Sequence, residues 1–350
     1  MEAELKEIDE LKSKACLFNL IIYCYDENRL TYFTGLIRAI LERFPCRILL
    51  IKASDEGSIQ KRWASINRRE KSGAEGNEYS GLYEFSVPIA EGRQVPFLVL
   101  PHLVSDLPVF TLWGGELDLE AWILRFLMKL SDRLIVDSES SHTLQRFAAQ
   151  VVEGVEKRHW ELVDLNWMRM FGWREGLSHL FRESKRFEEL QHADQIEILY
   201  SARHDSYFHH SSTQAIYLQE WLAEEMGWKR LSGTIGSTHR RTHYRTNKGG
   251  LEVVLRGDVH EQGAPGTVMG VTINSSLKGT FRMIRDCDLE QLKVFFETEE
   301  SCQLPISIPF KSTLKSSSLL SEVFYSRHDH SYLKMLHQLV AEGMEWKKTE

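Results

Sequence analysis

The segment that decides the fold is residues 107–138, which reads LPVFTLWGGELDLEAWILRFLMKLSDRLIVDS. Its first part, Leu107–Trp113, is apolar enough for a buried strand and ends at a Gly-Gly turn. Asp118 then caps a helix whose apolar residues recur about every 3.6 positions, and Arg133–Val136 follows as a short strand. A strand, a helix and a second strand with short connections predict two parallel strands of an open α/β sheet.

The same alternation extends toward the amino terminus. Apolar runs at Leu17–Tyr25 and Arg47–Ala53 predict two further strands with a helix between them. The apolar residues of segment 59–66 fall at helical spacing and predict another helix, whereas the alternation over Tyr83–Ile89 predicts a strand at the sheet edge. We therefore predict an α/β fold whose first domain is an open, mostly parallel, Rossmann-like sheet.

The pattern changes near Gln195. A strand and a helix capped at Ser212 or Thr213 are followed by short strands separated by turns, and strands this close together pair antiparallel. The predicted elements are strands at 196–200, 251–256, 267–274 and 280–285, a helix near 288–298, and a long helix from about 317. The expected organisation is an α/β N-terminal domain at 1–155, a helical connector at 156–192, and an α+β C-terminal domain at 193–350.

The composition is that of an ordinary globular protein of two domains. The chain has 350 residues, 42% of them hydrophobic, and a formal net charge of −7. This acidic balance argues against nucleic acid and anionic membranes as partners. The longest apolar run is too short to cross a bilayer, the first residues lack a signal-peptide pattern, and the five cysteines show no C-x-x-C spacing. We expect a cytoplasmic location, with no membrane and no nucleic acid among the partners.

The loops in which an open α/β domain binds a cofactor carry no cofactor motif. After the first strand the sequence reads CYDENR (24–29), and no G-x-G-x-x-G or G-x-x-x-x-G-K-[ST] occurs in the chain. Without glycine the backbone cannot approach a pyrophosphate closely, and Asp26 and Glu27 would repel it. A nucleophile elbow and an H-E-x-x-H zinc helix are also missing. We therefore expect neither a cofactor nor a catalytic residue.

Three polar groupings have a chemical and a structural interpretation. Asp137-Ser138 follows a strand and could position a catalytic carboxylate, but helix capping is the better interpretation. His239 and His243 have ligand spacing only if their segment is helical, and its composition favours a strand or loop. The densest ligand-like cluster is read as solvated or capping groups and comprises His204, Asp205, His209 and His210. We expect no metal site.

A run of basic residues at 229–248 contains no Asp or Glu. Such a run could recognise phosphate or an acidic protein surface, or it could be a solvated strand pair, and both interpretations stay open. Its members are Lys229, Arg230, Arg240, Arg241, Arg245 and Lys248.

Four segments in order resemble a known family. They read DLPVFTLW (106–113), SDRLIVDS (131–138), DLNWMR with WRE (164–169 and 173–175), and AIYLQEWLAEEMGW (215–228). Together they resemble the glucose-6-phosphate dehydrogenase assembly protein OpcA family. The chain departs from the family pattern at Gly114, where a second Trp is usual, and at Met168 and 170–172. The resemblance implies a non-enzymatic factor that binds glucose-6-phosphate dehydrogenase, promotes its active oligomer and raises its activity, with no catalytic residue to carry over.

The matched segments and the basic run supply candidates for partner docking or for the seam between the domains. Tryptophan and arginine are enriched at interface hot spots, whereas the usual burial of large aromatic residues favours the seam. If the connector is helical, Asp164 suits an N-cap and Arg169 lies four residues from Trp173 on one face. The candidates are Trp113, Asp164, Trp167, Arg169, Trp173, Arg174, Arg240, Arg241 and Arg245.

The leading hypothesis is an assembly and allosteric activation factor for glucose-6-phosphate dehydrogenase in the oxidative pentose phosphate pathway. The alternative is an enzyme acting on a sugar phosphate or nucleotide bound between the two domains. Nucleic-acid binding through 229–248 is a third hypothesis, and the acidic overall charge argues against it.

Overall fold

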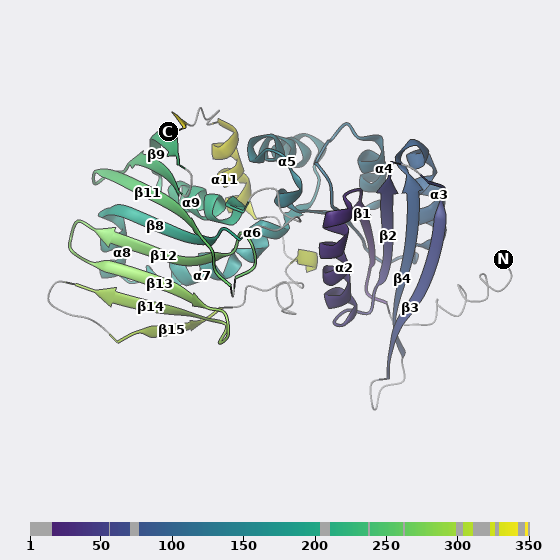
Figure 1. Cartoon of the computed structure of the whole chain (residues 1–350), viewed down its shortest axis with the longest axis horizontal. Coiled ribbons are helices and arrows are strands. Elements are labelled where there is room, and N and C mark those ends of the chain that lie inside the picture. Colours follow the sequence, from purple (N-terminus) through teal and green to yellow (C-terminus); the bar gives the residue numbers. More distant parts are fainter. Residues whose placement is uncertain are drawn as a thin grey trace. The chain divides into compact units, whose positions relative to one another are not determined.

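The computed structural model describes residues 16–55, 57–70, 77–203, 211–236, 239–261, 263–298, 304–310, 323–325, 329–341 and 347–348. The chain divides into two compact units (Figure 1). The first unit comprises Met1–Ser141, Glu153–Leu165 and Leu320–His328. The second unit comprises His142–Val152, Asn166–Leu319 and Asp329–Glu350.

The first unit is built on a seven-stranded sheet in the order β3-β4-β2-β1-β5-β6-β7. Every neighbouring pair is parallel except β3 and β4, which are antiparallel. The strands are β1 (Asn19–Cys24), β2 (Arg47–Ser54), β3 (Gln60–Glu70), β4 (Asn77–Pro88), β5 (Val109–Trp113), β6 (Arg133–Val136) and β7 (Leu162–Asp164). Every residue of β1 is buried, as expected for the centre of a sheet covered on both faces.

Helices connect these strands. Asp26 is the N-cap of the first helix after β1, where its side chain accepts a 2.8 Å hydrogen bond from the backbone N–H of Asn28. The helical elements are α2 (Glu27–Leu41), η1 (Ile89–Gln94), α3 (Val95–Val99), η2 (Leu100–His102), α4 (Trp122–Leu130), η3 (Ser138–Ser140) and α5 (Leu144–Arg158). Helix α5 contributes residues to both units.

The second unit contains a nine-stranded sheet in the order β15-β14-β13-β12-β8-β11-β10-β9-β16. Its pairs are antiparallel except β8 with β11 and β9 with β16. The strands are β8 (Ala193–Ser201), β9 (Lys229–Ile235), β10 (His239–Arg245), β11 (Gly250–Asp258), β12 (Val268–Ser275), β13 (Thr280–Asp286), β14 (Gln291–Glu297), β15 (Ile306–Pro309) and β16 (Lys347–Lys348).

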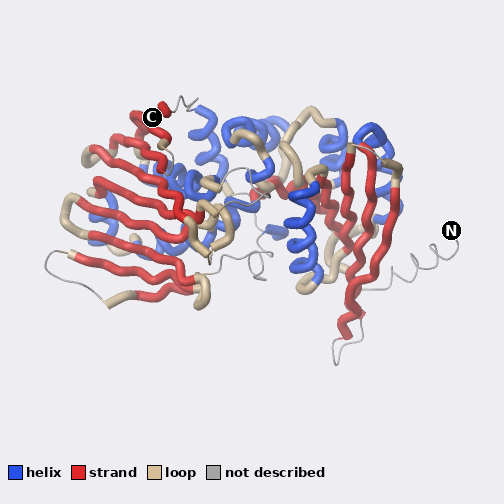
Figure 2. The backbone as a smooth tube through the Cα atoms, viewed as in Figure 1, coloured by secondary structure: helices blue, strands red, loops and turns tan. Residues whose placement is uncertain are grey.

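Helices lie against one face of the nine-stranded sheet (Figure 2). Ile196 and Ile198 of β8 alternate toward that face and are fully buried. Phe181, just after α7, packs edge-on against Phe281 of β13 with 5.2 Å between ring centroids. The helices of this unit are α6 (Leu165–Arg169), α7 (Phe171–Leu180), α8 (Ser184–Gln191), α9 (Thr213–Met226) and α11 (His330–Ala341). Because both sheets are present, one mostly parallel and one mostly antiparallel, the predicted α/β class with these two kinds of sheet is confirmed.

Two predicted helices are wrong. Segment 59–66 falls largely in β3, which pairs antiparallel with β4. Strand β3 is therefore the edge strand, and β4, predicted at the sheet edge, lies between β3 and β2. Residues four apart share a face of a strand as well as a face of a helix, so the spacing of Ile59 and Trp63 could not distinguish the two. The helix predicted near 288–298 is strand β14, in which the buried residues Leu292 and Val294 alternate at the period of a strand.

Helix α5 begins at Leu144, after the short turn η3. The terminal helix is present as α11, and the start predicted for it near residue 317 lies outside the described residues.

Candidate functional site

An ion pair lies at the carboxyl edge of the seven-stranded sheet, where open α/β sheets ordinarily bind ligands. Arg29 in the first turn of α2 places its Nη2 2.7 Å from Oδ2 of Asp137, at the end of β6, and both side chains are almost fully buried. The guanidinium of Arg29 also lies 5.0 Å from the ring centroid of Tyr32 and 5.2 Å from that of Phe33. A charged side chain of the protein therefore occupies the helix start that would face a bound phosphate.

Aromatic rings lie directly against the Gly114-Gly115 turn at the end of β5. A Cβ built at Gly114 would lie 2.3 Å from the ring of Phe33 and 2.9 Å from the carbonyl oxygen of Tyr23. A Cβ at Gly115 would lie 2.2 Å from the ring of Tyr25. Phe33 thus takes the space beside Gly114, the position at which the family pattern has a second Trp, so the turn holds packed rings.

The polar residues at the ends of β6 and β7 bond to one another. Asp164 is fully buried and accepts hydrogen bonds from the hydroxyl and the backbone N–H of Ser138 at 3.2 and 3.3 Å. Asp137 caps η3 by accepting a 3.2 Å bond from the N–H of Glu139, in addition to its ion pair with Arg29. These bonds fit the structural interpretation of Asp137-Ser138, because both carboxylates hold strand ends together.

Three of the candidate docking residues are tryptophans, and all three are buried. Trp113 stacks on Tyr23 with ring centroids 4.4 Å apart and an interplanar angle of 8°. Burial raises the pKa of the Tyr23 hydroxyl to about 12. Trp173 donates from Nε1 to the carbonyl of Val268 at 3.2 Å, and Trp167 is 2% exposed. None of these tryptophans presents its ring on the surface, and whether any of them forms a domain seam stays a prediction.

Trp167 and Arg174 belong to a cluster that the sequence did not reveal, together with Asp329. The guanidinium carbon of Arg174 lies 3.7 Å from the ring centroid of Trp167. Asp329 accepts hydrogen bonds from Nη1 of Arg174 at 2.8 Å and from Nε1 of Trp167 at 2.7 Å. Its other oxygen accepts a 3.0 Å bond from the N–H of Ser331 in the first turn of α11. The cluster fastens the start of α11 to α6 and α7.

The charges of this cluster depend on one another. Burial alone would raise the pKa of the Asp329 carboxyl, but the charge and hydrogen bond of Arg174 and the indole of Trp167 lower that pKa below its ordinary value. Burial lowers the pKa of the Arg174 guanidinium, and Asp329 opposes this effect. The available sequence signal was an Asp just before a helix, which is typical of an N-cap. The local sequence gives no indication that Arg174 and Trp167 are partners of Asp329, because they lie 155 and 162 residues away.

The remaining connector candidate is Arg169. Its Nη1 donates a 2.7 Å hydrogen bond to the side-chain oxygen of Asn166, three residues earlier in α6. The bond stays within one turn of the helix and indicates a local structural role.

The basic run at 229–248 does not form one surface. Arg230 pairs with the buried Glu220 of α9, whereas Arg241 lies 3.2 Å from Glu252 of β11. Burial raises the pKa of Glu220, although Arg230 opposes the shift. Burial lowers the pKa of Arg240, which points to the opposite face of β10 from Arg241. The sequence missed both acidic partners, because they come from elements outside the run.

The two histidines whose spacing would suit a metal only on a helix do not lie on one in the structure. His239 and His243 lie on β10, a strand, so the helical spacing that metal binding requires is not present. Within the described residues, no group of three or more His, Cys, Asp or Glu side chains has the geometry to hold a metal ion. The cluster His204, Asp205, His209 and His210 lies outside the described residues.

A depression of about 900 Å³ in the second unit lies beside α7, α8 and α9. Its lining combines apolar side chains such as Leu177, Trp221 and Met226 with Arg174, whose guanidinium already bonds to Asp329.

In the part of the chain that the structure describes, no helix is both long and apolar enough to span a bilayer.

The fold built on these two sheets is similar to that of solved structures. The arrangement is similar to that of 3-ketoreductase KijD10 from Actinomadura kijaniata, solved with TDP-benzene and NADP, with a TM-score of 0.54, 11% identity, and coverage of 96% of this chain and 100% of that one. A putative oxidoreductase, YvaA from Bacillus subtilis, matches with a TM-score of 0.53, 9% identity, and coverage of 94% of this chain and 96% of that one. At these identities the likeness shows the fold alone.

The family is narrower than this fold class. Residues 37–153 match a family model described as the N-terminal domain of a glucose-6-phosphate dehydrogenase subunit, and residues 160–316 match the model of the corresponding C-terminal domain. The chain belongs to this family, the OpcA family of glucose-6-phosphate dehydrogenase assembly proteins. A search of curated proteins found no match.

Proposed function

We propose that this protein is a non-enzymatic factor that binds glucose-6-phosphate dehydrogenase, promotes assembly of its active oligomer and activates it allosterically. The proposal places this action in the cytoplasm, within the oxidative pentose phosphate pathway. Family membership supports the partner. The observation that supports a non-enzymatic role is the buried ion pair of Arg29 and Asp137, at the edge of the sheet where such folds ordinarily bind ligands.

A factor of this kind activates through differences in binding free energy. It must bind the active arrangement of the dehydrogenase more tightly than the inactive one, and the ratio of the two affinities sets the shift. A difference of about 1–3 kcal/mol would change the equilibrium by roughly 5–150-fold. Such a preference requires a defined protein surface and no reaction centre.

The direct test mixes the purified protein with purified glucose-6-phosphate dehydrogenase from the same source. We expect a saturable rise in dehydrogenase rate and a shift of the enzyme to a larger species in sedimentation. The matched control is this protein alone with glucose 6-phosphate and NADP, which should give no rate. Unchanged rate and sedimentation at micromolar concentrations would refute the proposal.

The alternative, an enzyme acting on a sugar phosphate or nucleotide, has a separate test. A ligand that binds only the native state stabilises it by RT ln(1 + [L]/Kd) and therefore raises the unfolding temperature. We expect no thermal shift with NADP, NAD or sugar phosphates, because Arg29 and the rings at Gly114-Gly115 occupy the edge of the sheet. A saturable shift with one of these compounds would favour the enzyme instead.

A further inference from the structure

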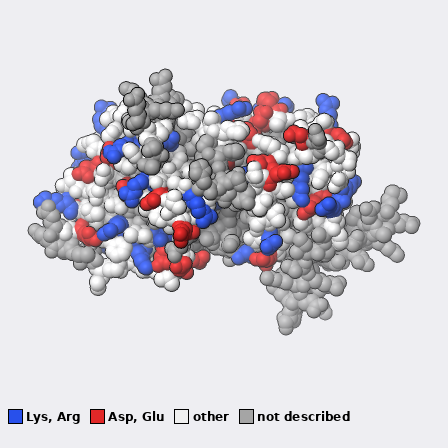
Figure 3. Space-filling view, viewed as in Figure 1, with Lys and Arg blue, Asp and Glu red and all other residues white. Residues whose placement is uncertain are grey.

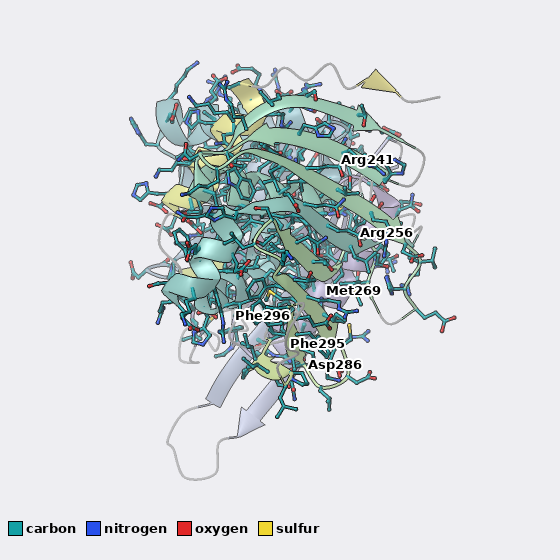
Figure 4. The ribbon with its side chains drawn as sticks, turned by 90° about the vertical axis from the view of Figure 1, so that its left-hand side faces the viewer. Arg241, Arg256, Met269, Asp286, Phe295 and Phe296 are labelled. Carbon is teal, nitrogen blue, oxygen red and sulfur yellow. The ribbon has the colours of Figure 1, made fainter. Side chains whose placement is uncertain are left out.

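One face of the nine-stranded sheet has no helix over it in the part of the chain that the structure describes (Figure 1). Seen along the strands, Arg241 and Arg256 project on the side away from the helices (Figure 4). Phe295 and Phe296 are consecutive in β14 and point to opposite sides, and Phe296 stacks on the buried Phe281 at 4.3 Å. We call the side that carries Arg241, Arg256 and Phe295 the open face.

The strand register places the side chains of the open face in three rows that cross β14, β13, β12, β8, β11 and β10. The first row is Glu297, Thr280, Asn274, Gln195, Glu252 and His243. The second row is Phe295, Arg282, Thr272, Glu197, Val254 and Arg241. The third row is Lys293, Ile284, Gly270, Leu199, Arg256 and His239.

The outer two rows carry opposite charge. The first row contains two glutamates and no Lys or Arg, whereas the third contains one Lys, one Arg and no acidic residue. Within the chain, Glu252 bonds to Arg241 of the middle row at 3.2 Å, and Arg256 bonds to Glu197 of the middle row at 3.2 Å. Lys293 also forms a 2.7 Å ion pair with Asp286, which lies on β13 two residues beyond Ile284 of the third row. Lys and Arg side chains are interspersed with Asp and Glu side chains on the face of this unit that Figure 3 shows.

The centre of the open face is less polar than a fully solvated sheet face. Leu199 and Ile284 flank Gly270 in the third row, and Ile284 is 41% exposed. The half-buried Phe295 in the middle row adds further apolar surface. Solvated faces of antiparallel sheets are ordinarily polar at outward positions, so these residues favour a face that becomes covered.

We propose that the open face binds the open face of a second copy of this chain. The two copies are related by a two-fold axis that lies between their sheets, runs across the strands and passes over the middle row. This axis places the first row of one copy against the third row of the other. Each strand then lies over its own counterpart in reverse direction, as in an aligned β-sandwich. The charge pattern thereby complements itself, which a uniformly charged nucleic acid or membrane surface could not do.

The symmetry specifies the contacts. Arg256 faces Glu252 of the partner subunit, and Lys293 faces Glu297 of the partner subunit, with each contact made twice. Charges then alternate from Glu197 through Arg256 to Glu252 of the partner subunit and Arg241 of the partner subunit. The pairs seen within one chain remain intact, so association requires no rearrangement of the sheet.

The test uses charge reversals on the full chain and sedimentation with light scattering at tens of micromolar protein. Wild-type chain should run at twice its mass of 40.7 kDa. Arg256→Glu places like charges opposite each other twice per dimer, as does Glu252→Arg, and each should weaken self-association by about tenfold or more. An equimolar mixture of the two variants restores both complementary contacts and should form a heterodimer. That rescue also demonstrates that each variant is folded.

Lys129→Glu on α4 is the matched control, because it reverses a charge away from the open face and should leave the dimer unchanged. A monomeric wild-type chain, reversals without effect, or a mixture as weak as the single variants would each overturn the proposal. A dimer unaffected by the reversals, together with lost activation of the dehydrogenase, would assign the open face to that enzyme and also overturn it. Failure of the proposed function leaves these measurements unaffected.

Discussion

The carboxyl edge of the seven-stranded sheet and the open face of the nine-stranded sheet use charge in opposite ways. At the edge, Arg29 and Asp137 are buried within the unit and bond to each other. On the open face, Arg241 and Arg256 pair with glutamates while about half of each side chain remains exposed. In a buried pair each charge depends on the other for stability, because either charge alone would be left without solvent. A surface pair contributes little to folding and remains available for association.

The largest expected effect comes from breaking the buried pair. Asp137→Ala removes the carboxylate that lies 2.7 Å from the buried guanidinium of Arg29 and should lower the free energy of unfolding by about 3–5 kcal/mol. Urea denaturation measures the loss. Replacing both residues by apolar ones, with Arg29→Met and Asp137→Leu, should recover most of it. The same loss in the double variant as in Asp137→Ala would contradict the ion-pair explanation.

The packed rings at the glycine turn are expected to give the next largest effect. Gly114→Ala brings a Cβ against Phe33 and against the rigid carbonyl of Tyr23, and should cost about 1–3 kcal/mol. Gly115→Ala should cost less, because the ring of Tyr25 is 42% exposed and can move. Gly35→Ala on α2 meets open space and should stabilise the protein by about 0.5–1 kcal/mol. Thermal unfolding of the three variants in this order checks the ranking.

A smaller effect is expected at the Asp329 cluster, and it depends on pH. The pKa of Asp329 is lowered in the folded protein, so its stabilisation is present above the ordinary carboxyl pKa and is lost as pH falls through the lowered value. Because this side chain is 39% exposed, solvent screening limits the contribution to about 1 kcal/mol or less. Asp329→Asn should therefore lower stability at neutral pH and approach wild type in acid. A stability difference from wild type that does not change with pH would argue against stabilisation by the charged form of Asp329.

The smallest effect on stability is expected on the open face. Arg241→Ala removes an exposed partner of Glu252 and should change the free energy of unfolding by less than about 0.5 kcal/mol in dilute protein. Urea denaturation at low protein concentration measures this change in the free energy of unfolding without a contribution from self-association. A loss comparable with that of Asp137→Ala would abolish the distinction between the two regions.

Local sequence pattern was sufficient for much of the fold. The apolar run Leu17–Tyr25 and the strand–helix–strand segment 107–138 lie in the sheet and helices they predicted. Segment 59–66 is a strand that the pattern mistakes for a helix, because residues four apart also lie on one face of a strand. Segment 288–298, also predicted as a helix, is strand β14. Boundaries such as the start of α5 at Leu144 depend on contacts beyond the local window.

The candidate site was harder to predict than the fold. Tryptophans at 113, 167 and 173 were candidates for docking or a seam because of residue type alone, and the structure buries all three. The sequence placed Arg240 and Arg241 in one basic run, but consecutive residues of a strand point to opposite faces. Asp329 was not among the candidates, although it joins Trp167 and Arg174.

The sequence by itself determined the two kinds of sheet, the absence of a glycine-rich phosphate loop, and the family resemblance. These features depend on residues close together in the chain, whose periodicity and turn chemistry act locally. Only the tertiary structure decided that Arg29 meets Asp137, which is 108 residues away, and that one sheet face remains without a helix in the described residues. Such pairings depend on which segments the packed core brings together, and a one-dimensional pattern does not specify that approach.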